Sequence, residues 1–470
     1  DRWTLLSKEA DKKPRWRDIE TCAPVATPEG QAFILEELRG GKAFAGYWAW
    51  ASGKLRYNGK EEGGDQAFFD PPVTVLEETA YAGQTLRTQG QRRGPQGALP
   101  YEMTIHVVET HAEAETPAGS FPDCLVLQIH SLVESGREAN ESLTELWLAP
   151  SVGVVRMVEY QRTTTAAIGQ EWAPGATSDL VWASVGGKTY GQPPVTLNTA
   201  SYFPLGEGNA YLYRNTDGSV REVTVGAQQM LDGCTVWPFV VTDPGPETWT
   251  ENWLGDDEGI KWSGLDGRGQ QLLLQPPAVL VGPAARQWDL FHSSGEWLVN
   301  GVAAGTYEVE AQVLDTDATA DVPARTFEHC LVVQVRGTYG PPGSKQSIES
   351  AYTLAPGVGV VRQTITAPTP GRTLVLLYAQ VESVDYGVRP RPGRPGDLDG
   401  DGYVTAADAR AMLECYLAGP SSYRVEADLA PHTCAYPNIT PVPDGKVNDQ
   451  DLKAFIGIWR ALHSGGDSGG

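Results

Sequence analysis

Aspartates spaced two residues apart near the C-terminus are the residues of this chain whose pattern most strongly favours a specific chemistry. Asp397, Asp399 and Asp401 are followed by Gly402, and Asp408 closes the segment at its twelfth position. Carboxylates at the first, third and fifth positions can converge on one cation, and the glycine permits the sharp turn that this requires. Ca²⁺ takes about six to eight oxygen ligands of this kind. The segment therefore predicts a calcium loop with these ligands: Asp397, Asp399, Asp401, Tyr403 through its carbonyl, Thr405 directly or through water, and Asp408.

A second acidic segment repeats the end of this pattern. The stretch from Asp444 to Asp451 fits positions five to twelve of a calcium loop, and Asp428 is the best candidate for the first position. Asp428 and Asp444 are 444 − 428 = 16 residues apart where four are expected, so twelve residues are inserted. The sequence predicts a second, weaker calcium site with these ligands: Asp428, Asp444, Lys446 through its carbonyl, Asn448 and Asp451.

Each acidic segment is followed by apolar residues at helical spacing, such as Met412 and Tyr416 after the first and Phe455 and Trp459 after the second. This duplicated loop and helix over 397–462, with aspartate instead of glutamate at the twelfth position, resembles a dockerin module. The resemblance implies two Ca²⁺ ions and a helix face that docks a cohesin-like partner, on a secreted or cell-surface protein. The alternative is a structural calcium clip that only folds the tail of the chain.

The overall charge excludes several classes of partner. Lys and Arg number 36 against 59 Asp and Glu, which gives a net charge of −23. Such an acidic chain disfavours nucleic acid and anionic membrane surfaces. No apolar run approaches the roughly 20 residues that span a bilayer. The first residue is Asp1, which favours a mature form whose signal peptide has been removed, although a trimmed chain would look the same.

An internal duplication organises the residues before 388. The segment from Phe121 to Cys124 recurs as Phe327 to Cys330, and the segment 148–156 recurs as 354–362, both at an offset of 206. Each copy reads as short alternating strands, which predicts two antiparallel β domains, expected as β-sandwiches. A short amphipathic helix over Gln31–Arg39 is the one expected exception. The expected parts are a β domain over 1–190, a second over 200–387, a Pro/Gly linker over 388–396, the calcium module over 397–462 and a Gly/Ser tail over 463–470.

The second copy carries signatures of a known kind of β domain. Its start at Tyr202–Tyr213 and its later Phe327–Cys330 and Ala355–Val360 segments resemble a β domain common in uncharacterised bacterial secreted proteins and lipoproteins. The resemblance implies a fold and no defined activity.

Six cysteines allow three disulfides in an exported protein. Cys22 and Cys124 are 102 residues apart and Cys234 and Cys330 are 96 apart, which suggests one equivalent disulfide in each β domain. The remaining two, Cys415 and Cys434, would then tie the first calcium helix to the inserted segment. The alternative is buried free thiols, above all at Cys124 and Cys330, which lie in apolar strands.

No catalytic constellation is recognisable in the sequence. The end of the chain, Gly466–Gly470, matches the nucleophile motif of trypsin-like proteases, but the strands that this motif needs cannot follow it. His106 and His111 are expected on opposite faces of a strand, which disfavours a zinc site at these two residues. No pair of carboxylates can be assigned as a glycosidase acid and nucleophile. We therefore predict no catalytic residues and favour a protein that is not an enzyme.

These observations favour a structural or adhesive protein outside the cell or on its surface. Its calcium module would serve attachment or self-assembly with a cohesin-like partner or with other copies of the chain. The alternative is a secreted enzyme or carbohydrate-binding protein docked to a cohesin scaffold.

The repeat also bears on assembly. At the offset of the repeat, Tyr202–Tyr213 has its counterpart only partly inside the chain. The first β domain is therefore expected to lack part of a strand, and strand addition from a neighbour would build a filament. The alternative is that Arg2–Leu6 supplies the missing strand itself.

Overall fold

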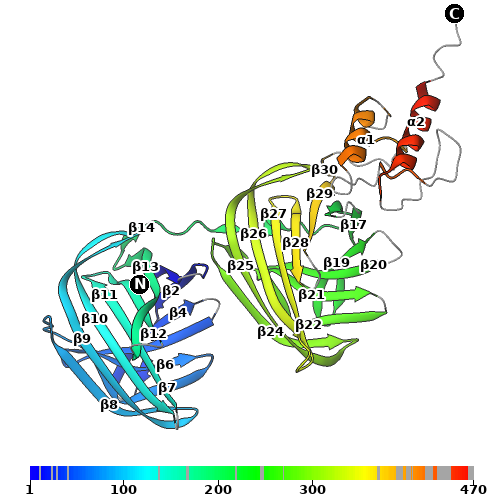
Figure 1. Cartoon of the computed structure of the whole chain (residues 1–470). Coiled ribbons are helices and arrows are strands. Elements are labelled where there is room, and N and C mark those ends of the chain that lie inside the picture. Colours follow the sequence, from blue (N-terminus) through cyan, green and yellow to red (C-terminus); the bar gives the residue numbers. More distant parts are fainter. Residues whose placement is uncertain are drawn as a thin grey trace, which may run out of the picture. The chain divides into compact units, whose positions relative to one another are not determined.

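A computed structural model gives the structure of the chain (Figure 1). It divides into two compact units, Asp1–Thr196 with Arg286–His292, and Leu197–Ala285 with Ser293–Gly470. Among the described residues, no helix combines the length and the apolar composition that spanning a bilayer requires. The residues that the structure describes are 1–9, 12–22, 25–27, 30–39, 42–135, 138–165, 169–216, 220–243, 248–267, 269–367, 371–387, 395–398, 404, 406–418, 427–430 and 446–463.

The first unit is a closed antiparallel β-barrel. Its fourteen-stranded sheet closes because β1 pairs with both β2 and β13. Two strands, β3 (Val25–Thr27) and β14 (Lys188–Gly191), lie outside the ring, which leaves twelve within it. Around the ring the strands are β1 (Arg2–Glu9), β2 (Arg15–Thr21), β4 (Gly30–Arg39), β5 (Lys42–Ala51), β6 (Lys54–Glu62), β7 (Asp65–Glu77), β8 (Thr85–Gly94), β9 (Gly97–Thr116), β10 (Gly119–Ser135), β11 (Glu138–Ala149), β12 (Gly153–Thr165) and β13 (Gly169–Val185).

The second unit contains a barrel of the same design, closed by pairing of β16 with both β17 and β29. The strands outside the ring are β15 (Leu197–Asn198), β18 (Gln229–Leu231), β23 (Ala284–Ala285) and β30 (Val384–Tyr386), and the short helix η1 spans Thr199–Tyr202. The twelve strands of the ring are β16 (Ala210–Asn215), β17 (Val220–Val225), β19 (Cys234–Thr242), β20 (Thr248–Asp256), β21 (Gly259–Gly267), β22 (Gln270–Val281), β24 (Leu290–Val299), β25 (Val302–Val322), β26 (Arg325–Gly340), β27 (Gln346–Ala355), β28 (Gly359–Ala367) and β29 (Arg372–Val381).

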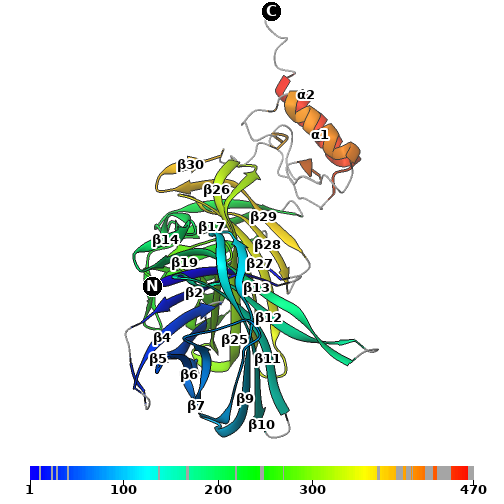
Figure 2. The same ribbon diagram turned by 90° about the vertical axis from the view of Figure 1, so that its left-hand side faces the viewer.

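Matching contacts confirm the duplication in three dimensions. Arg156 donates to the carbonyl of Glu115 at 2.6 Å, and Arg362 donates to the carbonyl of Asp321 at 2.7 Å, both displaced by 206 residues. One difference between the copies is the hairpin of β12 and β13, which is longer than that of β28 and β29 (Figure 2).

Three fold expectations are wrong. The β domains are barrels and not sandwiches, because the first and last strands of each ring pair with each other. The first copy does not lack a strand, since Arg2–Glu9 forms β1 and closes the ring, which removes the reason for strand addition from a neighbour. The segment Gln31–Arg39 is part of strand β4 and not a helix, because it pairs with β2 and β5.

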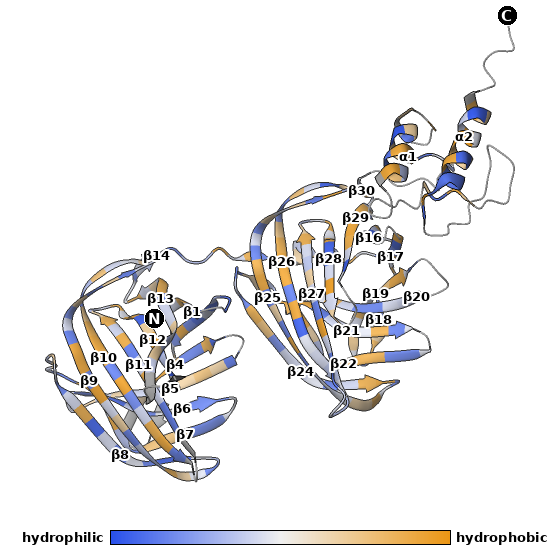
Figure 3. Ribbon diagram, viewed as in Figure 1, coloured by the Kyte–Doolittle hydropathy of each residue, from blue (hydrophilic) through white to orange (hydrophobic). Residues whose placement is uncertain are grey.

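Alternating side chains explain why these segments form barrel walls. The strands show hydrophilic and hydrophobic residues in turn along their length (Figure 3), as expected for a sheet with two different faces.

Close approach of neighbouring strands explains a glycine that is repeated in both barrels. A Cβ atom at Gly59 would lie 2.2 Å from the carbonyl oxygen of Ala67, and one at Gly264 would lie 2.0 Å from that of Leu272. Any larger residue at these two matching positions would force the strands apart.

The C-terminal part is helical. Its two helices, α1 (Ala406–Ala418) and α2 (Asp449–His463), pack in a separate apolar cluster that includes Met412, Phe455 and Ile458. This agrees with the two helices predicted after the acidic segments.

Candidate functional site

Six of the eleven predicted calcium ligands lie in the described part of the chain. The side chains of Asp397, Asp408, Asp428 and Asp451 are buried, with exposed fractions of 3% for Asp397 and 0% for the other three. Lys446 and Asn448 are also described, just before α2. The remaining five lie outside the described residues: Asp399, Asp401, Tyr403, Thr405 and Asp444.

The two acidic segments share one local geometry. The backbone N–H of Leu398, directly after Asp397, donates to Asp408 Oδ1 at 2.6 Å. The N–H of Leu429, directly after Asp428, donates to Asp451 Oδ1 at 2.8 Å. In each case the carboxylate is the third residue of its helix and holds the segment that begins the loop. The common bond places Asp428 at the position that Asp397 has in the first segment.

The second half-site has further bonds of the same kind. Asp451 Oδ1 also accepts from the N–H of Ala430 at 2.7 Å, and its Oδ2 accepts from the N–H of Asn448 at 2.8 Å. The Asn448 side chain accepts from the N–H of Gln450 at 2.8 Å and so caps the start of α2. These bonds fix both ends of the loop across the inserted residues.

Packing behind the loops repeats as well. At an offset of 43, the buried Met412 and Cys415 of α1 correspond to the buried Phe455 and Ile458 of α2. The offset between the loop starts, Asp397 and Asp428, is 31, and the difference of 43 − 31 = 12 equals the insertion read from the sequence. The module is therefore a tandem repeat whose second loop is longer.

The donor chemistry of these residues fits calcium. Four buried carboxylates in so small a module require compensation, because an ionised group loses its hydration on burial. Within the described residues, no three acidic, histidine or cysteine side chains meet at one point. The oxygens that would complete the first loop belong to residues outside that part of the chain. Oxygen ligands in this number favour Ca²⁺ over the softer metals.

The outward faces of the two helices carry exposed apolar residues. Leu413 is 47% exposed and Leu417 is 72% exposed on α1, while Ile456 is 39% exposed on α2. Leu413 and Ile456 are equivalent at the offset of 43. Exposed apolar residues therefore occupy equivalent positions of the two helices.

The cysteines are not paired as expected within the barrels. Cys22, Cys124, Cys234 and Cys330 are free thiols. Cys22 follows β2 and Cys124 lies in β10, and the shorter path around the ring between them passes through β1, β13, β12 and β11. The two cysteines therefore lie on strands that are not neighbours in the ring, and they are not bonded to each other.

The second expected pair is not bonded either. Cys234 in β19 and Cys330 in β26 lie on opposite sides of their ring. Cys124 and Cys330 fit the alternative of buried free thiols, because both are fully buried and donate to the carbonyls of Phe121 and Phe327 at 3.2 and 3.5 Å. Cys415 is buried in the helical cluster, and its expected partner Cys434 lies outside the described residues.

A cavity inside the first barrel is a feature that sequence reasoning missed. It has a volume of about 600 Å³ and is lined from nine strands of the ring, so it occupies the lumen. The wall is mainly apolar, with Phe33, Trp48 and Tyr57 among its aromatic residues. No local motif signals such a cavity, because its wall is assembled from residues far apart in the sequence.

Charged residues, buried to different degrees, lie at one side of this cavity. Arg17, whose side chain is 5% exposed, donates to Glu37 at 2.7 Å and to Glu159 at 3.0 Å. Arg39 forms a bidentate pair with Glu159 at 2.9 and 2.8 Å. Burial opposes ionisation of Glu159, but the hydrogen bonds and charges of Arg39 and Arg17 outweigh it and hold the pKa of this carboxyl below its usual value. We call these four residues the ionic cluster.

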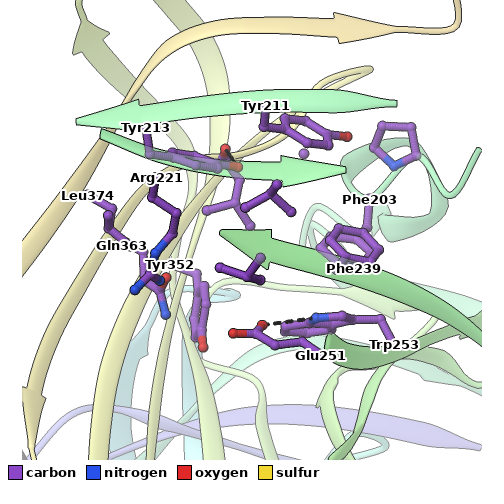
Figure 4. Close-up of a pocket in the computed structure, with 15 residues that line it drawn as sticks. Phe203, Tyr211, Tyr213, Arg221, Phe239, Glu251, Trp253, Tyr352, Gln363 and Leu374 are labelled. Atoms are coloured by element: carbon purple, nitrogen blue, oxygen red, sulfur yellow. Dashed lines mark hydrogen bonds between the residues drawn. The ribbon is translucent and has the colours of Figure 1, made fainter. Parts of the chain in front are cut away.

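The second barrel has smaller cavities of about 280 and about 50 Å³. Figure 4 shows the smaller one, where Arg221 points toward Gln363 and Tyr352. Arg221 occupies the position of Arg17 in the repeat and pairs with Asp243 at 2.7 Å. A buried arginine paired with an acid is therefore common to both barrels.

Comparisons with known proteins give two solved structures. One is a Bacteroides fragilis protein described as exported and as having a YmcC-like fold, with 12% identity, a TM-score of 0.21, and coverage of 38% of this chain and 98% of that chain. The other is a Parabacteroides distasonis protein described as a lipoprotein, with 14% identity, a TM-score of 0.21, and coverage of 38% and 97%. No family model and no curated protein sequence matches the chain.

Proposed function

We propose that the helical C-terminal part binds two Ca²⁺ ions and attaches a protein of two β-barrels to a protein partner outside the cell or on its surface. The observation that carries the proposal is the repeated bond from the second residue of each loop to the buried aspartate in the first turn of the following helix. Together with the Asp-x-Asp-x-Asp-Gly sequence of the first loop, this repeated bond supports a paired calcium-loop module.

Calcium would stabilise the module by relieving repulsion between its acids. Asp397, Asp399, Asp401 and Asp408 would bind the first ion, with oxygens of Tyr403 and Thr405. The second ion would be held by Asp428, Asp444, Lys446, Asn448 and Asp451. Because such ions bind only the folded loops, their binding free energy adds to the stability of the fold. At a free Ca²⁺ concentration about one hundred times the dissociation constant, this amounts to about 2.7 kcal/mol.

Thermal unfolding of the full chain, followed by far-ultraviolet circular dichroism of the helices, tests this proposal. Chelation should lower the midpoint of the helical transition by at least about 5 °C and leave the barrel transitions in place. Asp408→Ala should remove most of this calcium-dependent shift. Glu414→Ala, which removes an exposed acid from the same helix, is the matched control and should retain it. An identical midpoint with calcium and with chelator would refute calcium binding by this module.

A further inference from the structure

We propose that the lumen of the first barrel binds a lipid-like amphiphile, with its apolar body against the aromatic wall and its polar head at the ionic cluster. This site is independent of the calcium module. It rests on the size of the cavity, on the gradation of its lining and on the way in which the second barrel departs from it.

The size of the cavity points to a ligand. Protein interiors are close-packed, and voids larger than a water molecule are few. Small-molecule sites typically measure about 300–1,000 Å³ and are mainly apolar with a few polar groups. The first lumen, at about 600 Å³, falls in that range. Its lining combines aromatic and aliphatic side chains with only a few charged residues.

The change from apolar to charged side chains along one strand gives the orientation of the proposed ligand. On β4 the residues that line the cavity are, in order, Phe33, Leu35, Glu37 and Arg39. The apolar end faces Trp48, which pairs with Phe33 across the strands. The charged end belongs to the ionic cluster, where the side chain of Arg39 is 37% exposed and so reaches solvent. A ligand with an apolar body and a polar head matches this order.

The second barrel shows what closes such a cavity. Glu251, Trp253 and Tyr352 line both of its cavities and therefore separate them. The Trp253 indole N–H donates to Glu251 at 3.3 Å within this partition (Figure 4).

The first barrel lacks this partition. The equivalents of the three residues are Gly46, Trp48 and Leu146, which all line one continuous cavity. The strand register supports the equivalence, because Leu146 pairs with Leu127 and Tyr352 pairs with Val333, both displaced by 206. Two side-chain differences, at Gly46 and Leu146, thus distinguish a continuous lumen from a divided one.

Fluorescence titration of the full chain with cis-parinaric acid tests the site. Wild-type protein should bind one molecule per chain, and Leu146→Tyr, which copies the second barrel, should weaken binding at least about fivefold. Met157→Gln introduces the residue of the equivalent position, Gln363, and places a polar amide in the apolar wall of the lumen. It should also weaken binding, which keeps the test valid if Leu146→Tyr fails to fold. The matched control is Tyr352→Leu, which should leave the first site intact and raise the number of bound molecules toward two.

Competition with oleate and with 1-monooleoylglycerol then separates a carboxylate head from an uncharged one, and displacement by either supports the site. Absence of binding to wild-type protein would overturn the proposal. So would unchanged affinity in a folded Leu146→Tyr protein whose melting temperature matches that of the wild type.

Discussion

Glu159 shows how single residues of the barrel interior depend on partners far away in the sequence. It accepts hydrogen bonds from Arg17 and Arg39, which lie 142 and 120 residues earlier. Removing the carboxylate leaves the buried Arg17 with only Glu37 as an acidic partner in the ionic cluster. Loss of one partner from a fully buried pair costs about 3–5 kcal/mol. Because the Glu159 side chain is 29% exposed, we expect a smaller cost of about 2 kcal/mol for Glu159→Gln.

The pH dependence of this cost follows from the lowered pKa of Glu159. A carboxyl whose folded pKa is lowered contributes stability above its unfolded pKa of about 4.3 and loses it as the pH falls through the folded pKa. The difference in unfolding free energy between wild type and Glu159→Gln should therefore be full at pH 7 and shrink below about pH 4. Glu102→Gln, at an exposed site on β9, should show no such difference. A difference that stays constant across this range, measured by calorimetry, would contradict the role of the charge.

At the scale of elements, the sequence predicted the features that depend on a local pattern of residues. It did not predict the features that depend on pairing between strands far apart in the chain. The duplication, the antiparallel strands and the two helices follow from spacing and periodicity. Closure of the barrels does not, because it depends on pairing of β1 with β13, more than 160 residues away. The same cause explains Gln31–Arg39, whose apolar residues suit a helix in isolation but pair with β2 and β5 as a strand.

The candidate sites divide in the same way. The predicted calcium ligands lie in two short segments of the sequence. The prediction of Asp428, made across a twelve-residue insertion, is supported by the bond that repeats that of the first segment. The expected disulfides of the barrels find no support, because similar spacing in the sequence does not mean equivalent positions in the two copies. Cys22 follows β2, whereas Cys234 lies in β19, the counterpart of β4. The lumen of the first barrel left no local signal at all.

The exposed face of the helix pair leads to a prediction at this scale. Leu413→Asp combined with Ile456→Asp should reduce calcium-dependent binding at least about tenfold, since it places charges where an apolar partner surface is expected. Binding is measured by biolayer interferometry against purified cohesin domains and, for self-association, by sedimentation velocity with Ca²⁺. Val302→Asp changes an exposed apolar residue on β25 and is the matched control. Equal binding by the double variant and the wild type would exclude this face as the docking surface.

At the scale of the whole molecule, the two copies of the barrel have diverged in their interiors and kept the same arrangement of strands. Both rings keep a buried arginine paired with an acid, as Arg17 does with Glu37 and Arg221 with Asp243. They differ in whether the lumen is continuous or divided. The helical part carries its own duplication and its own apolar cluster, and its chemistry is separate from that of the barrels. Together, the two proposals describe a protein that combines a ligand-binding β part with a calcium-dependent attachment part.

Native mass spectrometry of the full chain, stripped of metal and then titrated with Ca²⁺, tests the central claim most directly. We expect two ions per chain in the wild type, one in Asp451→Ala, and two in the control Glu414→Ala. Addition of Mg²⁺ at the same concentration should not give the same occupancy, because Mg²⁺ demands a tighter octahedral site. A wild-type chain that gains no calcium at millimolar concentration would contradict the account, as would an Asp451→Ala chain that still gains two ions.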